Sequence, residues 1–191
     1  MEFELDKSAV AQLINCAAEY GVTVGEDWNE PEGARFVGSF EGTHITLFPK
    51  YDTQLALYFT VAHLYGHMVQ LALETPASQR VGTLIGVTGR SFTHAEVQAI
   101  YDHEREAAAI GRTLMARAAD VSRTVDLQYH RIFLADFHYL IHFLECGEKG
   151  VEAFERFMRR EPLPADPITP DARPLVELRG QVGKHNKVLV V

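Results

Sequence analysis

Two histidines placed four residues apart, His63 and His67, are the side chains of this sequence best suited to chemistry. Residues four apart lie on the same face of a helix, so both imidazole rings can reach one ion. Neutral imidazole is a good ligand for zinc, iron, copper and nickel. The surrounding segment is densely apolar, and an unpartnered imidazole would be costly to bury there. The pair therefore predicts a metal site.

A glycine between the two histidines, Gly66, supports this interpretation. Glycine in a helix interior costs roughly 1 kcal/mol relative to alanine. Its presence is easier to explain if another backbone or a ligand must come close at this point. We therefore expect a close approach beside the two histidines.

A second polar stripe interrupts an apolar segment nearer the C-terminus. His138, His142 and Glu145 recur there at i, i+4 and i+7 of an expected helix. These groups either hydrogen-bond to one another or to a neighbouring helix, or they serve the metal site. In the second case they are an extra ligand, a partner of a ligand, a proton shuttle, or part of a second metal position. The sequence leaves both alternatives open.

A β-hairpin is expected ahead of the two histidines. Alternating apolar residues flank a two-residue turn at Glu41-Gly42 and predict strands at residues 35–40 and 43–48. Residues 22–24 are a further short candidate strand. We expect these strands to form a small antiparallel sheet.

Helices make up most of the remaining chain. One long and largely buried helix is capped at Asp52 or Thr53 and ends near Leu73. Another long helix starts at a capping box formed by Thr93 and Glu96. Further helices are expected at residues 5–20, 126–145 and 151–160.

The length of 191 residues favours one domain, or one domain with a tail. We expect a single domain over residues 1–160 and a proline-rich C-terminal arm over residues 161–191, because five prolines fall between residues 162 and 174. The end of the arm, residues 187–191, is either an edge strand or an unstructured end. The expected fold class is α+β, with the small sheet packed on a helix bundle that carries the two histidines.

The composition limits the kinds of binding partner and the cellular compartment that we expect for this protein. The net charge of −8 argues against direct binding of nucleic acid or of an anionic membrane, since both are captured by basic surfaces. We find neither a secretory signal nor an apolar stretch of about 18 residues that would span a membrane. The two cysteines, Cys16 and Cys146, suit a reducing compartment. We expect a cytoplasmic protein, and the sequence does not indicate an oligomeric state.

The segment from Gly38 to Leu73, which contains the helix sequence YFTVAHLYGHMVQ, resembles the N-terminal half of ImmA/IrrE-type metallopeptidases. Residues 102–109, DHEREAAA, resemble the second helix of that family, which supplies a glutamate ligand. The resemblance covers residues 10–117. It implies a zincin-like fold and a metallopeptidase-like domain.

The same resemblance implies a set of metal ligands. His63 and His67 match the two histidines of the family motif, and Glu104 best matches the carboxylate ligand. Glu106 is the nearest alternative, and His138 and His142 are further alternates. Two imidazoles and one carboxylate leave coordination positions open, as catalytic sites require. His103, next to Glu104, is expected at the surface or beside a ligand rather than on the metal.

One position departs from the family pattern. The catalytic glutamate of the family directly follows the first histidine, where this chain has Leu64. In zinc hydrolysis that glutamate takes a proton from the metal-bound water, which leucine cannot do. The ligands are therefore kept while the hydrolytic base is lost, and ordinary peptidase activity is not expected.

These observations favour a metal-dependent enzyme with non-hydrolytic chemistry on a small molecule, with oxidation as one form of it. The ion would be one divalent transition metal, zinc or iron, with copper as a third choice. Iron is included because two histidines and a carboxylate also form the facial triad of non-haem iron oxygenases. The alternative is a catalytically inactive peptidase-like module that binds a protein or peptide partner in a regulatory role. A second alternative is a metallopeptidase with a relocated base. Catalytic candidates are His138, His142 and Tyr65, and the other groups considered as a base are Tyr101, Glu96 and Asp102.

Overall fold

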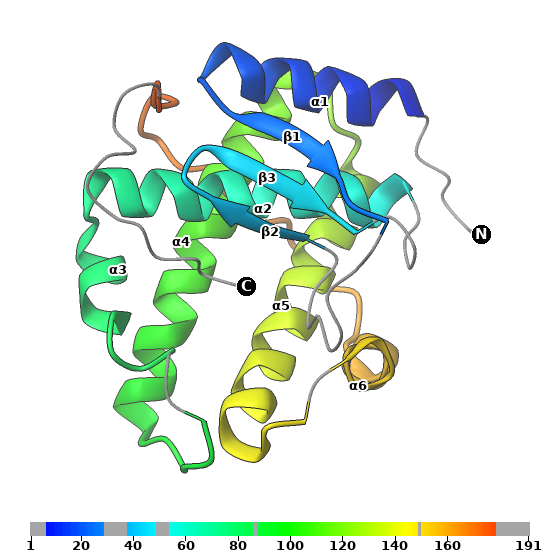
Figure 1. The fold of residues 1–191 in the computed structure, drawn as a ribbon. Coiled ribbons are helices and arrows are strands. Elements are labelled where there is room, and N and C mark those ends of the chain that lie inside the picture. The colour runs from blue at the N-terminus through cyan, green and yellow to red at the C-terminus, as the bar shows by residue number, and fades with distance from the viewer. Residues whose placement is uncertain (1–6, 29–37, 49–53, 86–87, 149, 179–191) are drawn as a thin grey trace.

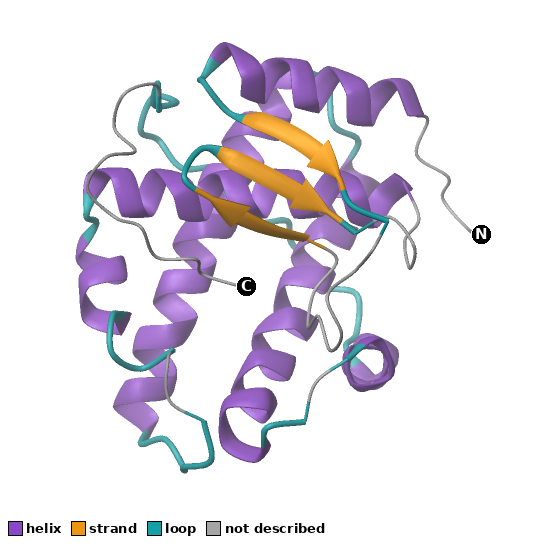
Figure 2. Cartoon of the chain, viewed as in Figure 1, coloured by secondary structure: helices purple, strands orange, loops and turns teal. Residues whose placement is uncertain are grey.

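The structure, a computed structural model, describes residues 7–28, 38–48, 54–85, 88–148 and 150–178. In these ranges the chain forms six helices and one three-stranded sheet, which confirms the expected α+β class. In Figures 1 and 2 the sheet lies in front of α2, α1 lies above it, and α4 crosses α2. The elements are α1 Lys7–Glu19, β1 Thr23–Glu26, β2 Gly38–Glu41, β3 His44–Leu47, α2 Gln54–Leu73, α3 Pro76–Val81, α4 His94–Ala118, α5 Arg123–Cys146 and α6 Val151–Arg160.

The sheet is mixed, so the expectation of an antiparallel sheet was wrong for one strand. β2 and β3 form the expected antiparallel hairpin, whereas β1 pairs with β3 in the parallel direction, in the order β1-β3-β2. The hairpin pattern determines only its own two strands. The direction of β1 depends on which edge of the hairpin it joins, and the packing of distant parts of the chain determines that edge. The turn is also one residue later than expected, since Glu41 pairs with His44 and Gly42 adopts a φ of 58°.

Hydrogen bonds from capping side chains mark the starts of three helices, α3, α4 and α5. At the start of α4 both halves of the expected capping box are present, because the Thr93 hydroxyl accepts from the Glu96 N–H and the Glu96 carboxylate accepts from the Thr93 N–H. α5 begins at Arg123 rather than at residue 126, capped by the Ser122 hydroxyl. The short helix α3 has Thr75 as its N-cap. Among the helices that the structure describes, none combines the length and the apolar character needed to cross a bilayer.

Helices α2 and α4 cross with their backbones in direct contact. A Cβ atom at Gly66 would overlap the carbonyl group of Ala107, and a Cβ atom at Gly111 would overlap the carbonyl group of Ala62. The two contacts are reciprocal, since each helix contributes one alanine and one glycine that are one turn apart. The close approach expected at Gly66 is therefore confirmed, and it is made by the α4 backbone.

The described part of the proline-rich arm folds back onto the helices. Ile168 and Leu178 are buried in the core. The Leu178 N–H donates to the Tyr20 carbonyl at 2.8 Å. The Tyr65 hydroxyl donates to the Val176 carbonyl and accepts from the Val176 N–H, at 3.3 and 3.2 Å. The arm thus packs with the helices up to the end of the described chain, and residues 187–191 lie outside the described residues.

The helix crossing predicts a strong effect of one methyl group. Gly66→Ala places a Cβ atom into the backbone of α4, which cannot move aside as a flexible side chain would. We expect a loss of about 2 kcal/mol or more in the free energy of unfolding, measured by urea denaturation. Gly82→Ala is the matched control, since its nearest neighbouring atom would lie at an ordinary 3.6 Å. Equal unfolding midpoints for the two variants would contradict the close crossing.

Candidate metal centre

Three ligand-type side chains from α2 and α4 converge beside the helix crossing. The Nε2 atoms of His63 and His67 lie 3.0 Å apart. Glu104 Oε2 lies 3.1 Å from the first of these nitrogens and 3.3 Å from the second. These three side chains form a group that could hold a metal ion. The structure thus brings together the three ligands that the sequence predicts.

The spacing of the three atoms fits an ion between them. Zinc bonds of about 2.0–2.1 Å in a tetrahedral site place ligand atoms about 3.3–3.4 Å apart. The three separations here, 3.0 to 3.3 Å, are close to that range. A divalent cation would accept a lone pair from all three atoms at once, whereas a single proton cannot bridge two ring nitrogens and a carboxylate equally. The donor set of two nitrogens and one oxygen suits first-row transition metals.

The helix crossing determines this geometry. His63 is one turn before Gly66 on α2, and Glu104 is one turn before Ala107 on α4. The ligands therefore project from positions next to the place where the two backbones touch. A wider spacing of the helices would move the carboxylate away from both rings.

The site is buried, and its carboxylate is stabilised in the ionised form. The side chains of His67 and Glu104 are 2% and 3% exposed, and that of His63 is 14% exposed. Burial raises the pKa of Glu104, but the two imidazoles beside it outweigh this effect and hold the pKa well below its usual range. Burial lowers the pKa of His63, but the hydrogen bond and charge of Glu104 outweigh it, so the pKa is raised. An ionised carboxylate in such a place favours a bound cation.

Gln70 determines which nitrogen of His67 faces the cluster. The amide nitrogen of Gln70 donates to the His103 carbonyl at 2.8 Å and to Glu106 Oε2 at 2.9 Å. Its oxygen therefore points at His67 Nδ1, 2.9 Å away. Because that oxygen can only accept, Nδ1 carries the proton, and in the neutral ring Nε2 keeps its lone pair for an ion. The histidine is thus held in the tautomer that binds metal.

Glu106, the alternative carboxylate ligand, faces away from the ligand group. Its oxygens accept hydrogen bonds from Gln70, from Thr75 at 2.6 Å and from Arg173 at 2.9 Å. Burial raises the pKa of Glu106, but these hydrogen bonds outweigh it, and the pKa is lowered. The structure places Glu104, and not Glu106, with the two histidines.

The histidines of α5 lie on another face of the molecule. His138 Nδ1 is 3.0 Å from a carboxylate oxygen of Glu161, and His142 Nε2 is 2.7 Å from one of Glu148. The His142 ring also packs against Phe157 of α6. Of the alternatives that the sequence left open, hydrogen bonding to neighbours is the one observed. These alternates are not brought to the ligand group, because the face of α5 that carries them turns toward α6.

The groups considered as a replacement base make other contacts. Tyr65 is bonded to the backbone of the arm, and burial raises its pKa. Glu96 belongs to the capping box of α4, and its hydrogen bonds with Arg90 and then the cap residue lower its pKa to about 2. Asp102 accepts a hydrogen bond from a glutamine on its own helix. Tyr101 packs against two phenylalanines of α5.

Leu64 places hydrocarbon directly after His63, where the metallopeptidases that the motif resembles have a catalytic glutamate. The side chain is buried, and its Cδ1 would lie 3.3 Å from a Cβ atom placed on Gly38 of β2. It is therefore packed between α2 and the sheet. This contact is consistent with the loss of a hydrolytic base next to His63.

Two further residues act on the ligand group: His103, which was expected at the surface or beside a ligand and is found beside one, and Asp136, which no motif marks. His103 is buried with its ring 5.0 Å from that of His67, and burial and then the charge of His67 lower its pKa to about 4. Asp136 of α5 is one of the charges that raise the pKa of His63. It shares a helix face with Phe133, which packs against Tyr101 of α4. In the sequence, Asp136 could have been noticed as a carboxylate within a mostly apolar face of the expected helix.

Comparison of the chain with protein-family models, with curated proteins and with solved structures found no match. The likeness to ImmA/IrrE-type metallopeptidases therefore rests on the motif residues.

The ligand assignment can be tested by metal affinity. We expect Glu104→Gln and His67→Ala to weaken Zn²⁺ binding by at least about 100-fold, measured by competition with a chromophoric chelator, because each removes a direct ligand. His142→Ala is the matched control and should bind Zn²⁺ like the unchanged protein. Equal affinities in the Glu104→Gln and control variants would contradict the assignment.

Proposed function

We propose that this protein binds one divalent transition-metal ion, zinc or iron, through His63, His67 and Glu104 on a zincin-like scaffold of the ImmA/IrrE type. We further propose that it is an enzyme with non-hydrolytic chemistry on a small molecule. The observation that carries the proposal is the buried convergence of the three ligand atoms within 3.3 Å of one another. When bound, the ion supplies a Lewis-acidic or redox-active centre with open coordination positions.

The absence of a base beside the first histidine supports the non-hydrolytic part of the proposal. Leu64 has no group that accepts a proton, and it packs against the sheet. Proton transfer by a positioned side chain commonly contributes about 10²–10⁴-fold to a reaction rate. Peptide hydrolysis would lose that contribution, whereas redox chemistry at the ion does not require a glutamate at this place.

The depth of the ligands supports a small substrate. His67 and Glu104 are almost fully covered, and His63 is the ligand with the largest exposed fraction, 14%. A peptide would have to bring its backbone to the ion along an open groove. A small molecule can reach a site that is open only at one histidine edge.

A second candidate, a hydrolase with a relocated base, is favoured by one observation. Asp136 belongs to the α5 face that packs toward α4, and its charge acts on His63. A carboxylate near a metal-bound water can accept a proton from it. This candidate would restore hydrolysis through a residue that the family motif does not contain.

Metal content and the identity of residue 64 test the main proposal. Protein purified without a histidine tag should contain about one zinc or iron per chain, and elemental analysis should find none in His67→Ala. Leu64→Glu should gain casein hydrolysis that the unchanged protein lacks, and Leu64→Gln should not, since an amide is no base. The absence of metal from the unchanged protein would overturn the proposal. Casein hydrolysis by the unchanged protein would overturn its non-hydrolytic part.

The role of Asp136 is tested separately. Asp136→Asn removes a negative charge that raises the pKa of His63, so this pKa should fall in an NMR titration of the metal-free protein. Asp102→Asn is the control, because Asp102 is not among the charges that act on His63. The relocated-base candidate requires in addition that the unchanged protein hydrolyses a substrate and that Asp136→Asn abolishes this activity while the metal is retained.

A further inference from the structure

We infer that Gln70, Glu106 and Arg173 are positioning residues of the metal centre, and that docking of the C-terminal arm is thereby coupled to metal binding. This inference rests on the proposed metal site and extends it to a part of the chain outside the ligand motif. It follows from a continuous series of hydrogen bonds that runs from a ligand histidine to the arm.

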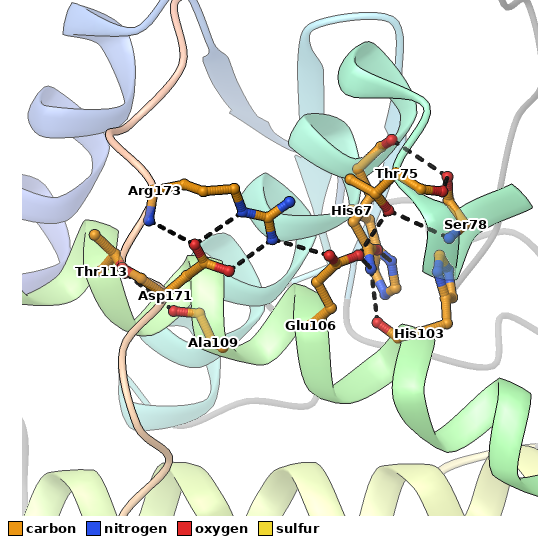
Figure 3. Close-up of polar contacts among 10 residues, drawn as sticks. His67, Thr75, Ser78, His103, Glu106, Ala109, Thr113, Asp171 and Arg173 are labelled. Carbon is orange, nitrogen blue, oxygen red and sulfur yellow. Dashed lines mark hydrogen bonds and ion pairs between the residues drawn. The ribbon is translucent and has the colours of Figure 1, made fainter.

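The series begins at His67 and passes through α4. Gln70 holds Nδ1 of His67 and donates to Glu106 Oε2. The same oxygen accepts from the Thr75 hydroxyl, and the other oxygen of Glu106 accepts from Arg173 at 2.9 Å (Figure 3). Every hydrogen-bonding atom of the Gln70 amide, and both oxygens of Glu106, are therefore engaged. The orientation of the amide depends on the two acceptors of its nitrogen, the His103 carbonyl and the Glu106 carboxylate.

Arg173, the arm residue at the end of this series, is held in place by Asp171. Two guanidinium nitrogens of Arg173 donate to the two oxygens of Asp171, at 2.9 and 2.6 Å. The backbone of Asp171 is in turn anchored to α4, where its N–H donates to the Ala109 carbonyl and its carbonyl accepts from the Thr113 hydroxyl (Figure 3). Paired, fork-like contacts of this kind fix the position as well as the charge of an arginine. Arg173 thus reaches Glu106 only when the arm is docked.

Removal of Arg173 would act on the metal centre through the Gln70 amide. Glu106 is partly buried, and without the guanidinium its charge is less compensated. A Glu106 side chain displaced from its present position no longer accepts from Gln70 Nε2. The amide nitrogen then keeps only the His103 carbonyl as an acceptor, so an amide turned with its nitrogen toward His67 Nδ1 becomes less unfavourable. A donor at that place requires the other tautomer. In that tautomer Nε2 of His67 carries the proton and cannot bind an ion.

Coupling of this kind is reciprocal. If a docked arm favours the metal-binding tautomer, then a bound ion must favour the docked arm by the same free energy. The amides of Asp171 and Val176, which donate to Ala109 and Tyr65, report on docking. Their hydrogen exchange should therefore become slower when Zn²⁺ is added.

The first test is the tautomer of His67 in the metal-free protein, read from ¹⁵N chemical shifts of labelled histidine. The unchanged protein should show the Nδ1–H form, and Arg173→Met should shift the population toward Nε2–H. Arg173→Lys keeps the positive charge and should restore part of the Nδ1–H population. Arg159→Met, which removes an exposed arginine of α6 that pairs with Glu155, is the matched control and should resemble the unchanged protein.

The second test is Zn²⁺ affinity by chelator competition. We expect Arg173→Met to bind about 10-fold to 100-fold more weakly than the unchanged protein, as is typical when a residue that orients a ligand is lost. The inference is overturned if folded Arg173→Met keeps both the tautomer and the affinity of the unchanged protein. It is also overturned if Zn²⁺ binds the unchanged protein but leaves exchange at Asp171 and Val176 as it was. If the unchanged protein binds no metal, the proposed function fails, and the tautomer measurement still decides whether Arg173 positions His67.

Discussion

Helices α2 and α4 approach so closely at Gly66 and Gly111 that no side chain separates their backbones. Such a contact tolerates neither a larger residue nor a shift along either helix, because each glycine faces a carbonyl group of the other helix. The candidate metal centre depends on it. Two imidazoles come from one helix and the carboxylate of Glu104 from the other, and they meet only because the helices touch one turn away.

The polar groups of this region form one connected system of hydrogen bonds and ion pairs. Buried charge is costly unless it is paired, and here Glu104 is paired with two imidazoles while Glu106 is paired with Arg173. Gln70 joins the two pairs, since its amide contacts both His67 and Glu106. The C-terminal arm therefore contributes to the electrostatics of a site from which it is far away in the sequence.

Local patterns in the sequence determined the parts of this protein that depend on neighbouring residues. The spacing of His63 and His67 fixed their common helix face, and Gly66 between them indicated the close approach that α4 makes. Thr93 and Glu96 predicted the start of α4. Each of these patterns works within one or two helical turns, where backbone geometry alone decides which groups meet. The choice of Glu104 as the third ligand came instead from the family resemblance, and the structure places it with the histidines.

Only the tertiary structure decided how distant segments are brought together. It turned His138 and His142 of α5 toward α6, let the charge of Asp136 act on His63, and made β1 run parallel to β3. It also docked the arm through Arg173, although its prolines suggested a separate extension. These outcomes depend on which faces of the elements pack against one another. That choice is made by the burial of the whole core and by the pairing of its charges, and no short pattern in the sequence contains it.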